Sequence, residues 1–303
     1  MSKNRKKLDI DLNSLINPAE IIKTTDNFNN NNNNNNNRNY VIIDGSYYCF
    51  YRYYALTNWW RNAKPEDKDD TNYIDKPEFV DKFKKIFQLK IKEIIKKLKI
   101  ENATIIVAKD CARENIWRNS YIENYKSNRI YDETFKQKGC GAFFKIVFEE
   151  KLFVKGGVSM IIEHPKLEAD DCAAIYSKMI LEKSPNSNIY IITSDQDYLQ
   201  LACNQIKLFN LQYKDLTEKS LKNPEKDLLY KIILGDKSDN ISGVFDKVGN
   251  KTALKLVEDQ NLLEKKLGEN EEYKKKFELN KKIIDFNEIP LDLVNEFKAN
   301  YDL

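Results

Sequence analysis

The sequence predicts an α/β domain with a mainly parallel sheet flanked by helices, followed by a helical C-terminal region. Three observations support this fold class. Short apolar runs alternate along the chain with longer segments of helical periodicity. The runs are apolar throughout, as is typical of strands that are buried on both faces. After about residue 223 the pattern is helical to the end of the chain.

The expected elements follow from this pattern in chain order. Strands are predicted at 40–44, 103–108, 158–163, 189–193 and 206–209, because each is a short apolar run. Helices are predicted where apolar residues recur at three- to four-residue spacing, at 79–98, 168–182, 228–234 and 252–257, around Leu199 and Leu201, and in the charged segment after Asn261. The α/β domain is therefore assigned to residues 40–222 and a helical subdomain to residues 223–303.

Two segments do not fit this alternation. Residues 1–39 contain a basic cluster and nine consecutive asparagines, from Asn29 to Asn37, so we expect a disordered leader. Residues 130–157 are rich in aromatics, lysine and glycine without a clear period. We expect this segment to form a mobile connection over one edge of the sheet.

The composition excludes several classes of protein. Lys and Arg number 50 and Asp and Glu 47, so a wholly basic nucleic-acid arm does not describe the chain and any charged surface must be local. The 5 cysteines form no C-x-x-C pair, and His164 is the one histidine, which excludes zinc ribbons and multi-histidine metal sites. No apolar run approaches the ~20 residues of a membrane helix. An intracellular location without membrane contact is expected.

Acidic residues follow the predicted strands. In an open parallel sheet, ligands bind beyond the carboxyl ends of the strands, so these acids are expected to share one rim. Asp and Glu also occur commonly as caps and turn formers, and any one of them alone could have that role. The acids at these positions are Asp44, Asp110, Glu168, Asp170, Asp171, Asp195 and Asp197, with Asp236 and Asp239 at the start of the helical region.

So many carboxylates in one place would repel one another unless cations neutralise them. Oxygen ligands without histidine or thiolate favour Mg²⁺ or Mn²⁺. Two such ions, about 3.5–4 Å apart, are a known device for phosphodiester cleavage. The predicted cofactors are therefore two Mg²⁺ or Mn²⁺ ions, and phosphodiester hydrolysis is favoured over structural metal binding.

Cations and aromatic residues lie close to these acids in the sequence. Between residues 82 and 138 there are fifteen Lys and Arg and seven Asp and Glu. For Arg118, Lys126 and Arg129 we favour a role in phosphate binding. A glycine turn that leads into a helix, with Gly243, Gly249, Lys251 and Thr252, could present backbone N–H groups to a phosphate, or it could be a plain turn between two helices.

Six motifs, in this order, resemble the 5′ nuclease superfamily, which comprises flap endonucleases, bacteriophage 5′-3′ exonucleases and the nuclease domain of bacterial DNA polymerase I. They are Val-Ile-Ile-Asp44-Gly, Tyr125-Lys126-x-x-Arg129, Glu168-Ala-Asp170-Asp171, Thr193-Ser-Asp195-x-Asp197, Gly235-Asp236-x-Ser-Asp239-Asn-Ile and Gly249-x-Lys251-Thr252-Ala253. The resemblance spans residues 40–258 and is closest to the bacterial and phage branch. It implies a PIN-like fold with a helical arch at about 113–157 and a helix-hairpin-helix at about 236–257.

The resemblance also implies roles for the residues. One metal would lie among Asp44, Asp110, Glu168 and Asp170, and the other among Asp171, Asp195, Asp197, Asp236 and Asp239. Catalysis would involve Lys126, Arg129, Asp44 and Asp171. DNA contacts would involve Arg118, Tyr125, Lys126, Arg129, Gly243, Gly249, Lys251 and Thr252. K⁺ would bind at the hairpin, where this chain has Lys247-Val248-Gly249 in place of the usual Gly-Ile-Gly.

The function that follows is a monomeric, Mg²⁺-dependent 5′-3′ exonuclease or flap endonuclease of replication and repair. Its partners would be DNA with a 5′ flap, a nick or a free 5′ end, and also RNA–DNA hybrids. No sliding-clamp peptide of the form Gln-x-x-aliphatic-x-x-aromatic-aromatic is present. Two alternatives remain open: a PIN-type single-strand ribonuclease, and a catalytically silent protein that binds branched DNA.

Overall fold

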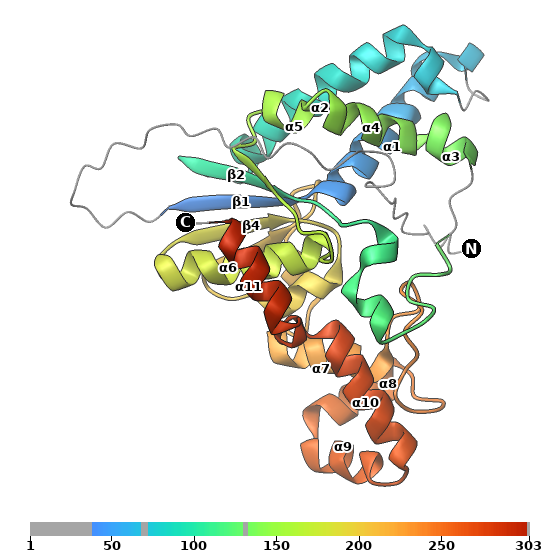
Figure 1. Ribbon diagram of the computed structural model, residues 1–303, viewed down its shortest axis with the longest axis vertical. Helices are drawn as coiled ribbons and strands as arrows, with labels where there is room; N and C mark the ends of the chain where they lie inside the picture. The colour runs from blue at the N-terminus through green and yellow to red at the C-terminus, as the bar shows by residue number, and fades with distance from the viewer. Residues whose placement is uncertain (1–37, 68–71, 130–132, 302–303) are drawn as a thin grey trace.

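A computed structural model describes residues 38–67, 72–129 and 133–301. Its centre is an all-parallel sheet in the order β3-β2-β1-β4-β5 (Figure 1). The strands are β1 (Asn39–Asp44), β2 (Ala103–Ala108), β3 (Met160–Ile162), β4 (Asn188–Ile192) and β5 (Ile206–Phe209). The predicted fold class and all five predicted strands are confirmed. The leader predicted at 1–39 lies almost entirely outside the described residues.

Helices cover both faces of the sheet because successive strand residues point to opposite faces. In β1, Val41 and Ile43 face one core cluster, whereas Tyr40 and Ile42 face another. The first cluster is covered by α1 (Gly45–Ala63), α2 (Pro77–Leu98), α4 (Cys140–Glu149) and α5 (Leu152–Lys155). The second is covered by α6 (Ala169–Lys183), the 3₁₀ helix Gln196–Leu201 and α11 (Leu291–Asn300).

The segment expected to be mobile, and to form the second half of an arch, belongs instead to the core. After the short α3 (Glu133–Gln137), the helix α4 buries Phe143, Phe144 and Val147 against α1 and α2, and α5 follows directly. The prediction of a mobile connection is therefore wrong for 140–157, whereas the arch stays a prediction. The aromatic residues that obscured the helical period are the ones that pack here, and burying them offsets the entropy of ordering the segment.

The C-terminal region is helical, as predicted. It contains α7 (Pro224–Leu234), α8 (Asn250–Glu258), α9 (Gln260–Leu267) and α10 (Glu271–Ile284), which extend away from the sheet (Figure 1). The last helix, α11, returns to the sheet layer, where Leu293 and Phe297 join the second core cluster. Residues 223–303 are therefore not one separate unit. A helix-hairpin-helix across α7, its following loop and α8 stays a prediction.

None of the helices in the described part of the chain is long and apolar enough to cross a membrane.

Candidate functional site

The acids at the first two strand ends are held by local hydrogen bonds. Asp44 ends β1 and caps α1: it accepts from the Tyr47 N–H at 2.9 Å and from the Thr193 hydroxyl at 3.0 Å. Asp110, just beyond β2, accepts from the Ser46 hydroxyl and from the Ala169 N–H, the latter at 2.9 Å. These bonds connect the ends of β1, β2 and β4 to the start of α6. Strand ends that were predicted to share one rim are thus held together.

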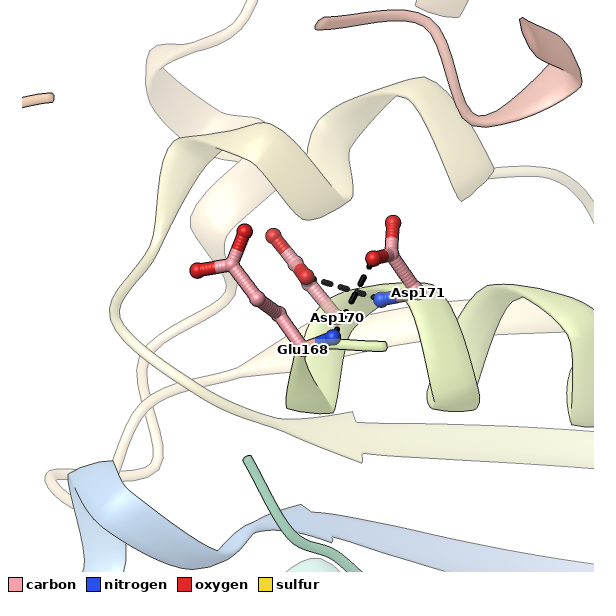
Figure 2. A group of neighbouring side chains, drawn as sticks. All are labelled: Glu168, Asp170 and Asp171. Carbon is pink, nitrogen blue, oxygen red and sulfur yellow. Dashed lines mark hydrogen bonds between the residues drawn. The ribbon is translucent and has the colours of Figure 1, made fainter. Parts of the chain in front are cut away.

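Three acids at the start of α6 form what we call the first carboxylate group: Glu168, Asp170 and Asp171. Oxygen atoms of all three lie within 4.8 Å of one another. Glu168 and Asp171 form a capping box, in which each side chain accepts from the backbone N–H of the other. Figure 2 shows the Glu168 N–H donating to Asp171, at 3.2 Å, and the Asp171 N–H donating to Asp170, at 2.8 Å. The unpaired N–H groups of a helix start stabilise negative charge, so the helix itself holds these acids in place.

Asp171 is 0% exposed and does not line the cavity described below. Both terminal nitrogens of Arg118 donate to its carboxylate, each at 2.7 Å, and the Trp117 indole N–H donates at 2.9 Å. Asp171 was predicted to join the second metal, but its carboxylate lies with those of Glu168 and Asp170. Arg118 was predicted to contact DNA, but it is 2% exposed and also donates to the Ile283 carbonyl. It holds α6 and α10 together.

Glu168 binds two of the cations that were predicted to contact phosphate. It accepts from Arg118 at 2.9 Å, from the Tyr125 hydroxyl at 3.0 Å and from Lys126. Burial alone would raise the pKa of Glu168, but Lys126 and Arg118 outweigh it and lower the pKa. Tyr125 is buried beside this carboxylate, so it presents no ring face for stacking on a base.

Lys126 has an unusual backbone. Its φ of 54° is in the left-handed region, which side-chain-bearing residues rarely adopt. Its N–H donates to the Asp239 carbonyl at 3.0 Å, and Arg113 donates to its carbonyl. Such strain is found where the surrounding structure must hold one residue in place, and here that residue carries the cation. The pattern of the sequence gave no sign of this conformation or of the role of Arg113.

A second carboxylate group consists of Asp197, Asp236 and Asp239, whose oxygen atoms also lie within 4.8 Å of one another. Lys231, on α7, pairs with Asp197 and with Asp236, the latter at 3.0 Å, and Arg129 pairs with Asp239. Burial alone would raise the pKa of Asp236, but Lys231 outweighs it and lowers the pKa. Lys231 was missed because one of its two partners, Asp197, belongs to another segment of the chain, far from it in the sequence.

The turn that carries Asp236 requires a glycine. Gly235 has a φ of +69°, and a Cβ at this position would lie 2.5 Å from the carbonyl oxygens of Ile241 and Ser242. Any other residue would be strained there and would displace the turn. The glycine therefore sets the position of the acid that follows it.

A cavity of about 1030 Å³ adjoins the first carboxylate group. Its acidic lining consists of Asp44, Asp110, Glu168, Asp170 and Asp195, and its basic lining of Arg113, Lys126 and Arg129. One wall is aromatic and is formed by the residues Tyr47, Phe50, Tyr51 and Tyr54 on α1. The second carboxylate group does not line the cavity, although it is joined to it through Arg129.

The electrostatics of the cavity favour a bound cation. Burial, with Asp171 and Glu168 nearby, raises the pKa of Asp170 to about 7, and burial also raises the pKa of Asp110. These shifts report chiefly the cost of burying the carboxylate charges, with repulsion between neighbouring acids added, and a divalent ion would offset both. All the acidic donors are oxygen atoms, as Mg²⁺ and Mn²⁺ prefer. The buried Tyr198 hydroxyl, which also lines the cavity, has no hydrogen-bond partner among the described residues. The residues present fit a divalent ion.

The remaining predicted residues lie at the start of α8, outside the lining of the cavity. Gly249 is the N-cap of α8, and no atom lies within 4 Å of where its Cβ would be, so the backbone there is open to approach. Lys251 and Thr252 are exposed in the first turn of the helix. Gly243 is different, because a Cβ there would lie 3.0 Å from the Leu234 carbonyl oxygen, so its role is to pack against α7.

Known proteins resemble this chain in sequence and in structure. A 5′-3′ exonuclease of Buchnera aphidicola is 30% identical over 224 residues, which are 72% of this chain and 69% of that protein. DNA polymerase I of Lactococcus lactis is 27% identical over 237 residues, 74% of this chain but 24% of the polymerase. This chain thus spans about a quarter of that relative.

One similar solved structure is the flap endonuclease of bacteriophage T5 in a pseudo-enzyme–product complex with DNA and metal ions. The TM-score is 0.61 at 18% identity, with 87% of this chain and 97% of that chain covered, which shows a shared fold. Residues 39–227 match the family described as 5′-3′ exonuclease, N-terminal resolvase-like domain. The chain therefore belongs to the 5′-3′ exonuclease family.

Proposed function

We propose that this protein is a Mg²⁺- or Mn²⁺-dependent nuclease that hydrolyses phosphodiester bonds near the 5′ end of branched or nicked DNA. The observation that carries this proposal is the cavity, which combines metal-binding carboxylates, three cations and an aromatic wall. A phosphate with its adjoining bases needs these three features together. Carboxylates alone would repel a polyanion.

The residues that would hold the ions are divided between the two sides of the rim. Asp44, Asp110, Glu168 and Asp170 would hold one ion. Asp195, Asp197, Asp236 and Asp239 would hold the other, some of them through water. Bound divalent ions lower the pKa of a water nucleophile and neutralise charge on the phosphate. Asp171 would hold the α6 helix start in place through Arg118 and would not touch the reacting atoms.

Lys126 and Arg129 would bind the scissile phosphate. Burial opposes the charge of Lys126, but Asp239 and Glu168 outweigh it and raise its pKa well above the ordinary value of lysine. Lys126 therefore stays charged at any working pH and can stabilise negative charge that develops on the phosphate. Its carboxylate partners become available for an ion when the ammonium turns to the substrate.

The duplex part of the substrate would bind the start of α8. Open backbone at Gly249, with Lys251 and Thr252 exposed beside it, suits a DNA phosphate without reading the bases. The bacteriophage T5 relative was solved with DNA and metal ions, which supports DNA as the substrate class. RNA–DNA hybrids, which present the same kind of phosphate, are proposed as further substrates.

The test is cleavage of an end-labelled 5′-flap duplex with Mg²⁺ or with EDTA, for the wild type and for Asp170→Asn. We expect metal-dependent incision near the junction that the variant loses. Strong cleavage of unstructured RNA with little on the flap would favour a single-strand ribonuclease. Tight, metal-independent binding without cleavage would favour the silent DNA-binding protein.

A further inference from the structure

Tyr198 is a buried tyrosine whose hydroxyl has no partner. It lies in the 3₁₀ helix Gln196–Leu201, directly after Asp197 of the second carboxylate group. Its ring belongs to the second core cluster and packs against Phe286, with centroids 6.4 Å apart and planes at 69°. It is 1% exposed, and its hydroxyl accepts or donates no hydrogen bond within the described residues. A buried tyrosine hydroxyl usually has a partner.

Tyr198 borders the cavity that holds the acids. Tyr198 is part of the cavity lining, together with Asp44, Asp110 and Asp170. A tyrosine hydroxyl carries a proton at neutral pH and can donate it. A buried donor without an acceptor, on a residue that lines a cavity of oxygen ligands, indicates that one of those ligands accepts from it when the site is filled.

A core tyrosine could also be present for its ring alone. That explanation predicts that the hydroxyl is merely tolerated, since phenylalanine would fill the same volume without the cost of an unsatisfied O–H. The two explanations therefore differ in what removing the oxygen atom does to metal binding.

We propose that Tyr198 is a positioning residue whose hydroxyl hydrogen-bonds an oxygen ligand of the divalent ion held by Asp44, Asp110 and Asp170, and so strengthens binding of that ion. This inference rests on the metal-dependent function proposed above. Hydrogen bonds to the ligands of a metal orient them and commonly change metal affinity by 10–100-fold.

The experiment compares Mn²⁺ binding by the full chain and by Tyr198→Phe with titration calorimetry. We expect the dissociation constant of the ion to rise by about 10–100-fold in the variant. The metal-free melting temperature should stay the same or rise, because the change removes an unsatisfied polar atom and keeps the ring. The Mg²⁺ concentration for half-maximal cleavage should rise, with kcat largely recovered at saturating Mg²⁺.

Tyr48→Phe is the matched control. Tyr48 is also fully buried, but its hydroxyl donates to the Phe87 carbonyl at 2.7 Å and it does not line the cavity. Its loss should lower the metal-free melting temperature and leave Mn²⁺ affinity unchanged. Tyr198→Phe should thus weaken Mn²⁺ binding without lowering the metal-free melting temperature, whereas Tyr48→Phe should lower that temperature without changing Mn²⁺ binding.

Two results would overturn this inference and leave the proposed metal-dependent function standing. One is an Mn²⁺ dissociation constant in Tyr198→Phe within about twofold of the wild type, since the outer hydrogen bond would then contribute nothing. The other is a lowered metal-free melting temperature with unchanged affinity, which would assign the hydroxyl to packing. If the wild type binds no Mn²⁺ at all, the proposed metal-dependent function fails together with this inference.

Discussion

The two carboxylate groups are built in different ways. Glu168, Asp170 and Asp171 are neighbours in sequence at one helix start, where backbone N–H groups hold them. Asp197 lies in the 3₁₀ helix that follows β4, whereas Asp236 and Asp239 lie in the turn after α7. The first group is therefore complete once α6 forms. The second exists only when α7 docks on the 3₁₀ helix.

Their neutralising cations differ in the same way. The first group is served by Arg118 and Lys126, of which Arg118 is almost wholly buried. The second is served by Arg129, whose side chain is 6% exposed, and by Lys231 of α7, whose side chain is 17% exposed. A buried pair is costly to break, and a more exposed one is exchangeable. We infer that the pair of Arg118 with Asp171 is the fixed part of the site, and that Lys231, the most exposed of these four cations, is its adjustable part.

The largest effect should come from the first group. Asp170→Asn removes a proposed ligand from the cavity, and flap cleavage should fall by about 10³-fold, equivalent to several kcal/mol of transition-state stabilisation. Asp292→Asn, at an exposed position on α11, is the control and should cleave at the wild-type rate. Single-turnover cleavage at saturating Mg²⁺ measures both. A loss of less than about tenfold would contradict the assignment of Asp170.

The same variant should change how stability depends on pH. The pKa of Asp170 is about 7 in the folded protein and its ordinary value is 3.8. Between these values the unfolded chain releases the proton while the folded one keeps it, so the metal-free wild type loses stability as the pH rises. Asp170→Asn lacks this loss and should become the more stable protein above about pH 4, increasingly so up to about pH 7.

Urea unfolding in EDTA from pH 4 to 8 measures that difference, and added Mn²⁺ should restore the wild type alone. A difference between the two proteins that stays constant with pH would show that Asp170 does not titrate in this range.

Breaking the buried pair of Arg118 and Asp171 should lower the free energy of unfolding more than it lowers the rate of cleavage. In Arg118→Leu the Asp171 charge is left buried without its partner, and the free energy of unfolding should fall by about 3 kcal/mol. The control is Arg61→Leu, since this half-buried arginine donates to the Tyr73 hydroxyl at 3.1 Å, and about 1 kcal/mol is expected there. Equal losses of unfolding free energy in the two variants would show that the buried pair contributes no more to stability than the Arg61 hydrogen bond does.

The smallest effect is expected in the second group. Lys231→Met removes the cation shared by Asp197 and Asp236, and the metal-free free energy of unfolding should fall by about 1–2 kcal/mol. Mn²⁺ should then raise the melting temperature of the variant more than that of the wild type, because the ion no longer competes with an ammonium.

Lys226→Met, which breaks an exposed pair between α7 and Glu258, is the matched control and should change neither quantity measurably. A smaller metal-induced shift in Lys231→Met than in the wild type would mean that the second group binds no ion.

Several parts of this fold could be predicted because they depend on local patterns. The strands are continuous apolar runs, and α2 and α6 show a clear period. In contrast, α1 and α4 were missed because apolar and aromatic residues also lie outside their buried faces, which hides the period; in α1 several of these aromatic residues line the cavity. The acids were found because each follows a strand end. The burial of Asp171 could not be predicted, since it depends on Arg118, which lies 53 positions away in the sequence.

The chain's local patterns were enough to specify a parallel sheet, a rim of acids and the motifs of a nuclease family, because strand burial, helix starts and glycine turns are properties of neighbouring residues. Only the folded molecule decided which acids face the cavity, which are neutralised inside the protein, and that Lys231, Arg113 and Tyr198 belong to the site. Those outcomes depend on charges and hydrogen bonds between segments that meet only after the helices dock.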